Sequence, residues 1–411
     1  MTYCQNYHLL KRIFNQCDEV TRIPDSSVEM IHSSFVSESQ RLLPGATSYS
    51  CDAHRLVFDG EDSLEDTGLP THIRELSLAD AHFTANREFR YTIFKPADGR
   101  KADRVILLLH GLNERHWYKY LPWAQKLVEL TGHAVCLFPI AFHMNRAPEE
   151  WSSAKRMNLV AQERRSTYPS IAQSSFANAA ISTRLHNRPQ RFFWSGVQTY
   201  NDVERLIGCF HSGGHPHVAQ HARVNFFAYS IGSFLAQIML MANRSGSLAD
   251  AKLFIFCGGP TFDRMYPVSK YIMDSEAMIA LYAFYVEHLD NEFKRDKRLS
   301  HYFAQGHASG EYFRAMLSIR KLKAMREQRL QELSSNIMAV ALKRDEVIQP
   351  SEVVNTLKGD SRTIPIPVHV MDFPYDHSHV MPFPYQESIA AEVDRGFNQV
   401  FAMAAQHLTA C

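Results

Sequence analysis

Long apolar runs alternate with segments of helical periodicity through most of this chain. Residues 104–109 contain five consecutive apolar side chains, and residues 134–139 form a second such run. Between them, apolar positions in residues 116–130 recur every three or four residues, the spacing of a helix with one buried face. A buried strand, a helix and a second buried strand with short connections predict a parallel pair joined by a right-handed crossover.

The same alternation continues toward the end of the chain. We expect further strands at residues 88–96, 224–229, 252–257, 337–342 and 367–372, and further helices at residues 197–210, 231–242, 276–293, 311–333 and 390–407. This order predicts an α/β fold with a mostly parallel central sheet and helices on both faces.

Three segments interrupt the sheet pattern. Residues 1–87 are predicted to form an N-terminal extension, irregular and with one or two short helices over its first 60 residues. Residues 88–411 are predicted to form the main domain. Within it, residues 141–195 and 261–335 carry no strand signal, so we expect two helical insertions that form a cap.

The junction at Ser230 is the most specific motif in the chain. A largely apolar run stops at this serine, small residues Ala228 and Gly232 flank it at two positions on either side, and a helical pattern follows. This is the layout of a nucleophile elbow, in which a sharp strand-to-helix turn exposes a serine hydroxyl. The pentad alone is a weak signal, since a serine that caps a helix has the same pattern.

An acid and a histidine follow at later strand ends, in the chain order that such enzymes use. Asp345 lies three residues after the strand at 337–342, with Glu346, Asp360 and Asp372 as rivals. Two histidines follow the last strand, and His379 is favoured over His377 as the general base because it leads a His-x-x-Pro-Phe segment. The aspartate is expected to orient the imidazole, and the imidazole to take the serine proton.

A His-Gly pair follows the first buried strand and fills the position of an oxyanion site. Gly111 is expected to let the backbone turn so that the Leu112 amide faces the reacting carbonyl, with the Ile231 amide as the second donor. Each such donor stabilises the transition state by about 3 kcal/mol.

With these parts in order, the chain resembles the α/β-hydrolase superfamily over about residues 88–140, 196–260 and 336–408. Leu109–Arg115, Ser174–Ala179 and Met371–Tyr375 also resemble a family of uncharacterised bacterial proteins within that superfamily. The resemblance implies the fold and leaves the substrate open. Ala228 in place of the usual glycine and the doubled histidine depart from the superfamily pattern.

Composition bears on whether the protein binds nucleic acid or a membrane. Lys and Arg total 44 against 43 Asp and Glu, so no net charge attracts nucleic acid. No apolar run is long enough to span a membrane, and the N-terminus lacks a signal-peptide pattern. Seven cysteines without a C-x-x-C pair favour a reduced setting, so we expect a cytoplasmic protein. The sequence does not predict an oligomeric state.

Two other patterns concern metal binding and substrate binding. The histidines at 211, 215, 217 and 221 lie in a Gly- and Pro-containing loop without an acid at metal spacing, so we interpret them as structural and expect no metal. The aromatic side chains of the insertions are first of all typical of core packing within the cap. As functional alternatives, they predict an apolar acyl pocket over Ser230, or a site where Arg146, Arg184 or Arg264 anchors an anionic group.

The prediction is therefore a serine hydrolase, esterase-like, which acts on a small-molecule acyl substrate and needs no cofactor. A non-catalytic binding or scaffold protein on the same fold is the alternative from another class. A peptidase or an acyltransferase on the same three residues differs only in substrate and acceptor.

Overall fold

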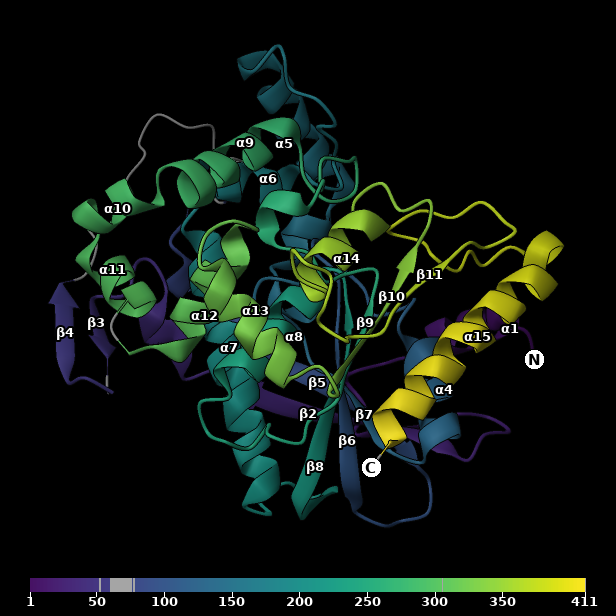
Figure 1. Ribbon diagram of the computed structural model, residues 1–411. Coiled ribbons are helices and arrows are strands. Elements are labelled where there is room, and N and C mark those ends of the chain that lie inside the picture. Colours follow the sequence, from purple (N-terminus) through teal and green to yellow (C-terminus); the bar gives the residue numbers. More distant parts are fainter. Residues whose placement is uncertain (52, 60–75, 77, 305, 411) are drawn as a thin grey trace.

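The computed structural model describes residues 1–51, 53–59, 76, 78–304 and 306–410 (Figure 1). Nine strands of the described chain form one sheet in the order β1-β2-β5-β7-β6-β8-β9-β10-β11. They are β1 (Val20–Arg22), β2 (Val28–Val36), β5 (Glu88–Pro96), β6 (Ala102–Leu109), β7 (Ala134–Leu137), β8 (Val218–Tyr229), β9 (Leu253–Phe256), β10 (Ile337–Leu342) and β11 (Val368–Met371).

Strands β7, β6, β8, β9, β10 and β11 run parallel, and β1, β2 and β5 extend the sheet in antiparallel pairings. Leu109 at the end of β6 pairs with Ala228 near the end of β8, and Leu342 at the end of β10 pairs with Met371 at the end of β11. The carboxyl ends of these strands therefore open at the same edge of the sheet, where parallel sheets place their sites.

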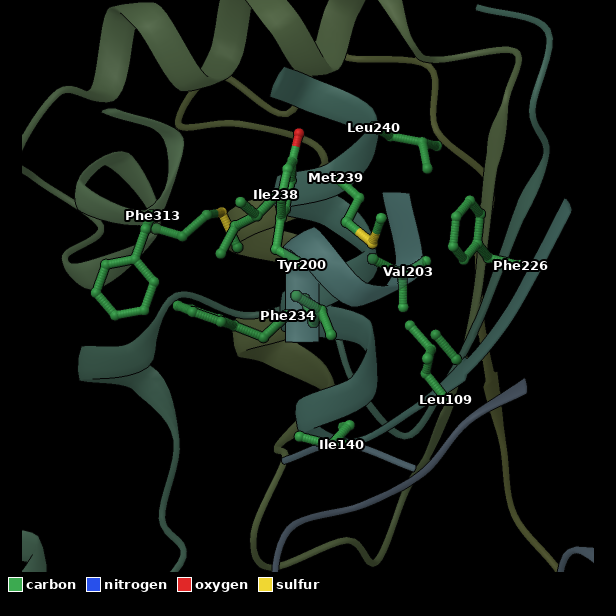
Figure 2. Close-up of a cluster of buried hydrophobic side chains, with 14 of the residues drawn as sticks. Leu109, Ile140, Tyr200, Val203, Phe226, Phe234, Ile238, Met239, Leu240 and Phe313 are labelled. Carbon is green, nitrogen blue, oxygen red and sulfur yellow. The ribbon is translucent and has the colours of Figure 1, made fainter. Parts of the chain in front are cut away.

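Alternate side chains of the central strands pack on opposite faces of the sheet. In β6, Val105, Leu107 and Leu109 join one buried cluster, whereas Ile106 and Leu108 join another. The first cluster packs under α7 (Arg191–His211) and α8 (Ile231–Ala242), and Figure 2 shows part of it. The second packs under α1 (Tyr3–Ile13), α4 (Leu121–Thr131) and α15 (Ala390–Thr409) (Figure 1). Burial on both faces explains the continuous apolar runs in the sequence.

The N-terminal segment differs from the irregular structure expected of its first 60 residues. After α1, strands β1 and β2 join the main sheet, with β2 paired along its whole length with β5. Strand β2 was not predicted because polar residues interrupt its apolar pattern. One of them, the buried His32, has its Nδ1 2.9 Å from the hydroxyl oxygen of Thr92. A hairpin of β3 (Ser48–Cys51) and β4 (Leu56–Asp59) follows. Residues 60–75 of the predicted extension lie outside the described residues.

Both predicted insertions are helical. The first contains η3 (Met144–Arg146), η4 (Glu149–Ser152), α5 (Ala154–Thr167) and α6 (Ala179–Asn187), and the second contains η5 (Phe262–Arg264), α9 (Ser275–Tyr282), η6 (Ala283–Glu287), α10 (Leu289–Arg295), α11 (Lys297–Ala304), α12 (Ala308–Leu317) and α13 (Lys323–Glu332). A buried ion pair between Arg164 and Asp274, at 2.7 Å, ties the two insertions together.

The helices expected at residues 276–293 and 311–333 are each broken in two. The first changes to a π turn after Tyr282. The second ends at Leu317 and resumes at Lys323, after Leu322 with a φ of 50°. The remaining described elements are η1 (Ser39–Leu42), η2 (Asp80–His82), α3 (Thr84–Arg87), α14 (Pro350–Leu357) and η7 (Glu387–Ile389). Within the described part of the chain, no helix has the length and apolar character that crossing a bilayer requires.

Candidate active site

Ser230 occupies a strained turn between β8 and α8. Its φ of 54° and ψ of −123° lie in a region that costs a side-chain-bearing residue about 1–3 kcal/mol. Such a conformation persists only where its surroundings enforce it. It turns the chain sharply from strand to helix and leaves Ser230 only 6% exposed, with its hydroxyl at the carboxyl edge of the sheet.

The small residues around Ser230 let strand and helix approach closely. A Cβ on Gly232 would lie 2.5 Å from the Leu109 carbonyl oxygen, so only glycine fits there. Ala228 is fully buried, and its methyl group packs in the cluster under α8. The extra methyl is therefore accommodated, and the turn forms without the glycine that is usual at this position.

A continuous chain of hydrogen bonds joins Ser230, His379 and Asp345. Ser230 Oγ lies 2.8 Å from His379 Nε2, and His379 Nδ1 lies 2.8 Å from Asp345 Oδ2. Because a carboxylate only accepts, Nδ1 carries the proton of the neutral ring and Nε2 accepts from the serine hydroxyl. The second carboxylate oxygen of Asp345 accepts from the amides of Val347 and Ile348, at 2.9 and 2.8 Å. The aspartate is thereby held in a single orientation.

A tight turn positions His379. Ser378 and Met381 exchange two backbone hydrogen bonds, of 3.3 and 3.1 Å, with His379 and Val380 at the corner. The ammonium of Lys119 donates to the Val380 carbonyl oxygen at 3.0 Å and pairs with Glu114. The ring of Tyr229 stacks on the imidazole of His379 with centroids 5.5 Å apart. The backbone turn and the stacked ring of Tyr229 therefore both limit the motion of the His379 imidazole.

His377 lies outside this hydrogen-bonded chain. Its Nδ1 is 3.1 Å from the Tyr375 carbonyl oxygen and 3.4 Å from the guanidinium of Arg344. The rival acids are also engaged elsewhere. Asp372 pairs with Lys343 and Arg344, Asp360 pairs with Lys323, and these cations lower the pKa of both carboxyls. Glu346 is exposed.

The loop after β6 presents backbone amides beside the serine turn. Its base is rigid, since the Gly111 amide donates to the Tyr120 hydroxyl at 2.9 Å and the Ile140 amide donates to His110 Nε2 at 3.0 Å. Burial holds the pKa of His110 well below its usual value, so this ring stays neutral. Within the described residues, the amides of Leu112 and Ile231 have no hydrogen-bond acceptor. Both residues line one cavity, and Ile231 directly follows Ser230 in the chain.

That cavity is apolar and has a volume of about 70 Å³. Its wall is built mainly from α7, α8 and α12, and three of its lining residues, Phe234, Ile238 and Phe313, are labelled in Figure 2. A wider hollow of about 580 Å³ lies on the other side of Leu112 and reaches the His379 turn at Ser378 and Val380. Leu112 therefore separates a small apolar cavity from a larger hollow that includes charged side chains, among them Arg115 and Lys119.

His143 is a site residue that the sequence analysis missed. Its ring lines the apolar cavity and is 7% exposed, and its Nδ1 lies 2.9 Å from the Ala141 carbonyl oxygen. Burial lowers its pKa to about 4, so the ring is neutral at pH 7 and donates through Nδ1. Its Nε2 is a buried acceptor without a partner among the described residues. Only its position after β7, another strand end, could have indicated it.

The arginines considered as anion anchors are already paired. Arg146 binds Asp202 at 2.8 Å and Arg184 binds Asp80, and both pairs are buried. Arg264 lies 3.9 Å from Glu352. The histidines at 211, 215, 217 and 221 are not a metal-ligand cluster within the described part of the chain. His215 Nε2 instead lies 2.9 Å from the Tyr91 hydroxyl.

The sheet order and the serine turn between β8 and α8 define the α/β-hydrolase fold. The chain belongs to a family described as "Family of unknown function (DUF6051)", whose profile matches residues 1–409. A search of curated proteins returns no match.

Several solved structures resemble the chain. A carboxyl esterase of the mycorrhizal fungus Tuber melanosporum is 11% identical over 78% of this chain and 81% of its own, with a TM-score of 0.41. A thermostable esterase of Pseudomonas putida is 11% identical over 100% and 92%, with a TM-score of 0.40. A putative dipeptidyl aminopeptidase IV of Bacteroides ovatus is 13% identical over 75% and 33%, with a TM-score of 0.38. Similarity at this level does not bear on activity.

Proposed function

We propose that this protein is a serine hydrolase that cleaves ester or related acyl bonds through an acyl-enzyme. The observation that carries the proposal is the hydrogen-bonded chain from Ser230 through His379 to Asp345, with both links at 2.8 Å. It stands at a strained serine on a strand-to-helix turn. A strained backbone, a hydrogen-bonded base and a buried acid together serve nucleophilic catalysis and have no evident value for packing.

In the first half-reaction, Ser230 Oγ attacks the acyl carbon and its proton passes to His379 Nε2. Asp345 stabilises the imidazolium that forms and keeps the ring in place. The amides of Leu112 and Ile231 hold the oxyanion of the tetrahedral intermediate, since they are free donors at the cavity wall. The intermediate collapses, the C–O bond to the leaving group breaks, and the imidazolium returns the proton to the departing alkoxide.

In the second half-reaction, His379 takes a proton from water and the resulting hydroxide attacks the acyl-enzyme. The second tetrahedral intermediate expels Ser230 Oγ, which recovers its proton from the imidazolium, and the carboxylic acid leaves. These steps use only side chains and amides of this chain, with water as the acceptor.

The two hollows on either side of Leu112 support an assignment of substrate parts. The apolar cavity of about 70 Å³ suits a short acyl group, and the hollow of about 580 Å³ suits a larger, more polar leaving group. No acidic side chain lines the described wall of the smaller cavity, so nothing there would hold the amino terminus of a peptide. This favours an esterase over an aminopeptidase.

A panel of p-nitrophenyl esters tests the proposal, with aminoacyl p-nitroanilides beside it. We expect the highest kcat/KM on acetate or butyrate and at least a roughly tenfold loss by dodecanoate, because each methylene group that the cavity cannot hold costs about 1 kcal/mol or more. Phe313→Leu should move the optimum toward longer chains, since Phe313 closes the cavity.

Phe401→Leu is the matched control, because Phe401 is also a buried phenylalanine but belongs to the cluster on the opposite face of the sheet and does not line the cavity. It should leave the chain-length profile unchanged. Faster turnover of the anilides than of every ester would contradict the assignment of an esterase, and a flat profile from acetate to dodecanoate would contradict the assignment of the acyl cavity.

A further inference from the structure

Four metal-binding side chains from distant parts of the chain meet away from Ser230. Ligand atoms of Cys51, His54, His301 and His307 all lie within 4.8 Å of one another. Cys51 ends β3, His54 follows in the turn before β4, His301 lies in α11, and His307 precedes α12. Among the described residues, this is the one group of three or more histidine, cysteine or acidic side chains with such spacing.

The distances within this Cys–His₃ cluster are close to those of tetrahedral zinc. Cys51 Sγ lies 3.4 Å from His54 Nδ1 and 3.3 Å from His307 Nε2, and His307 Nε2 lies 3.0 Å from His301 Nε2. Zinc bond lengths and tetrahedral angles place sulfur about 3.6 Å from nitrogen and two nitrogens about 3.3 Å apart. For one ion to bind all four atoms, these three pairs would move slightly apart and wider pairs, at up to 4.8 Å, would move closer together.

Hydrogen bonds alone explain the Cys–His₃ cluster poorly. His307 Nε2 approaches both the thiol of Cys51 and the imidazole nitrogen of His301, yet one ring nitrogen has either one proton or one lone pair. Cys51 and His307 are buried, at 3% and 8% exposed, and so is His301. A metal ion would satisfy all four ligand atoms at once.

The surroundings of the cluster are those of a supported metal centre. The ring of Tyr302 stacks on His307 with centroids 4.5 Å apart, and the ring of Phe58 lies 5.5 Å from that of His301. His54 is exposed, and a hollow of about 230 Å³ borders Cys51 and His307, so an ion can reach the cluster from solvent. The apolar rings limit ligand motion and water access once an ion is bound.

We propose that Cys51, His54, His301 and His307 bind one Zn²⁺ ion. A thiolate with three imidazoles favours zinc over the oxygen-seeking Mg²⁺ and Ca²⁺. With four protein ligands, the ion has no open position for water, so its role is structural. It joins the β3–β4 hairpin to helices α11 and α12 of the cap, as Figure 1 shows for these elements.

Metal content of the purified full-length protein tests this proposal. After exposure to Zn²⁺ and removal of free ion by gel filtration, we expect one zinc per chain by mass spectrometry. Cys51→Ser and His54→Gln each remove a direct ligand and should retain well under half a zinc per chain after the same treatment. Because His54 is exposed, His54→Gln tests binding in a protein that still folds. Cys17→Ser and His288→Gln are the controls, since both residues are exposed and lie outside the cluster.

Cobalt and thermal unfolding give two further readouts of the same site. The wild-type protein loaded with Co²⁺ should show intense tetrahedral d–d bands and a thiolate charge-transfer band, and Cys51→Ser should lose the charge-transfer band. Chelation of the metal should lower the Tm of the wild type by about 5 °C or more and leave the Tm of His54→Gln nearly unchanged. Wild-type protein that retains no zinc, or the two ligand variants that retain one zinc per chain, would overturn the proposal.

Discussion

Replacing Ser230 with alanine is expected to lower kcat for ester hydrolysis by roughly 10⁶-fold. The hydroxyl is the only proposed nucleophile, and nothing else on the turn can form the acyl-enzyme. A residual rate above that in water should remain, since the Leu112 and Ile231 amides and the acyl cavity still bind the transition state. The measurement is the rate of p-nitrophenyl butyrate hydrolysis by the purified variant.

Folding should survive this change. Alanine removes only the oxygen atom, and the backbone of the turn is enforced by the close approach of Gly232 to Leu109. Ser195→Ala is the control, because Ser195 lines the apolar cavity that Ile231 also lines, but its hydroxyl donates to the Phe192 carbonyl oxygen of its own helix. Ser195→Ala should keep the wild-type rate within a few-fold. A Ser230→Ala variant as active as this control would rule out Ser230 as the nucleophile.

The two histidines of the last loop are expected to differ sharply. His379→Gln should lower kcat by at least about 10⁴-fold, because the serine loses its general base. His377→Gln should change kcat less than about threefold, since the ring hydrogen-bonds with Tyr375 and Arg344 and packs on Phe373, outside the Ser230–His379–Asp345 chain. Glutamine has a similar size and can still hydrogen-bond, so both variants should fold, and thermal unfolding checks this.

Asp345→Asn changes the residue that holds Nδ1 of the proposed base, His379. An amide at this position can turn its NH₂ toward the ring and stabilise the wrong tautomer of His379, so we expect a loss of about 10⁴-fold in kcat. The effects of His379→Gln and Asp345→Asn should not add in the double variant, because both act through one imidazole. A full loss in His377→Gln with activity kept in His379→Gln would reverse the assignment of the base.

The strands could be predicted where burial on both faces leaves a continuous apolar run. The strands expected at residues 88–96 and 337–342 have the same bounds in the structure. Strand β2 was not predicted because His32 and its neighbouring serines interrupt the apolar pattern. The hydrogen bond that allows the imidazole of His32 to be buried, with the hydroxyl of Thr92, forms only in the folded chain. Periodicity also could not show that the helices expected at residues 276–293 and 311–333 are interrupted, the first after Tyr282 and the second after Leu317.

Strand ends were enough to propose Ser230 and Asp345, but the choice between His377 and His379 depended on one turn. The His-x-x-Pro-Phe segment favoured His379 without showing the turn itself, in which reciprocal hydrogen bonds between Ser378 and Met381 direct His379 toward Ser230. The Cys–His₃ cluster was beyond sequence analysis for a related reason. Cys51 and His54 form one pair with ordinary metal-ligand spacing, and His301 and His307 form another. The two pairs lie far apart in the sequence, and only the fold brings them together.

Covalent labelling with a fluorophosphonate tests the central claim most directly, because the probe reacts only with a serine that its own active site activates. The account predicts one adduct per chain, on the peptide that contains Ser230, with labelling lost in Ser230→Ala and greatly slowed in His379→Gln. A folded wild-type protein that stays unlabelled, or an adduct on any other residue, would contradict it.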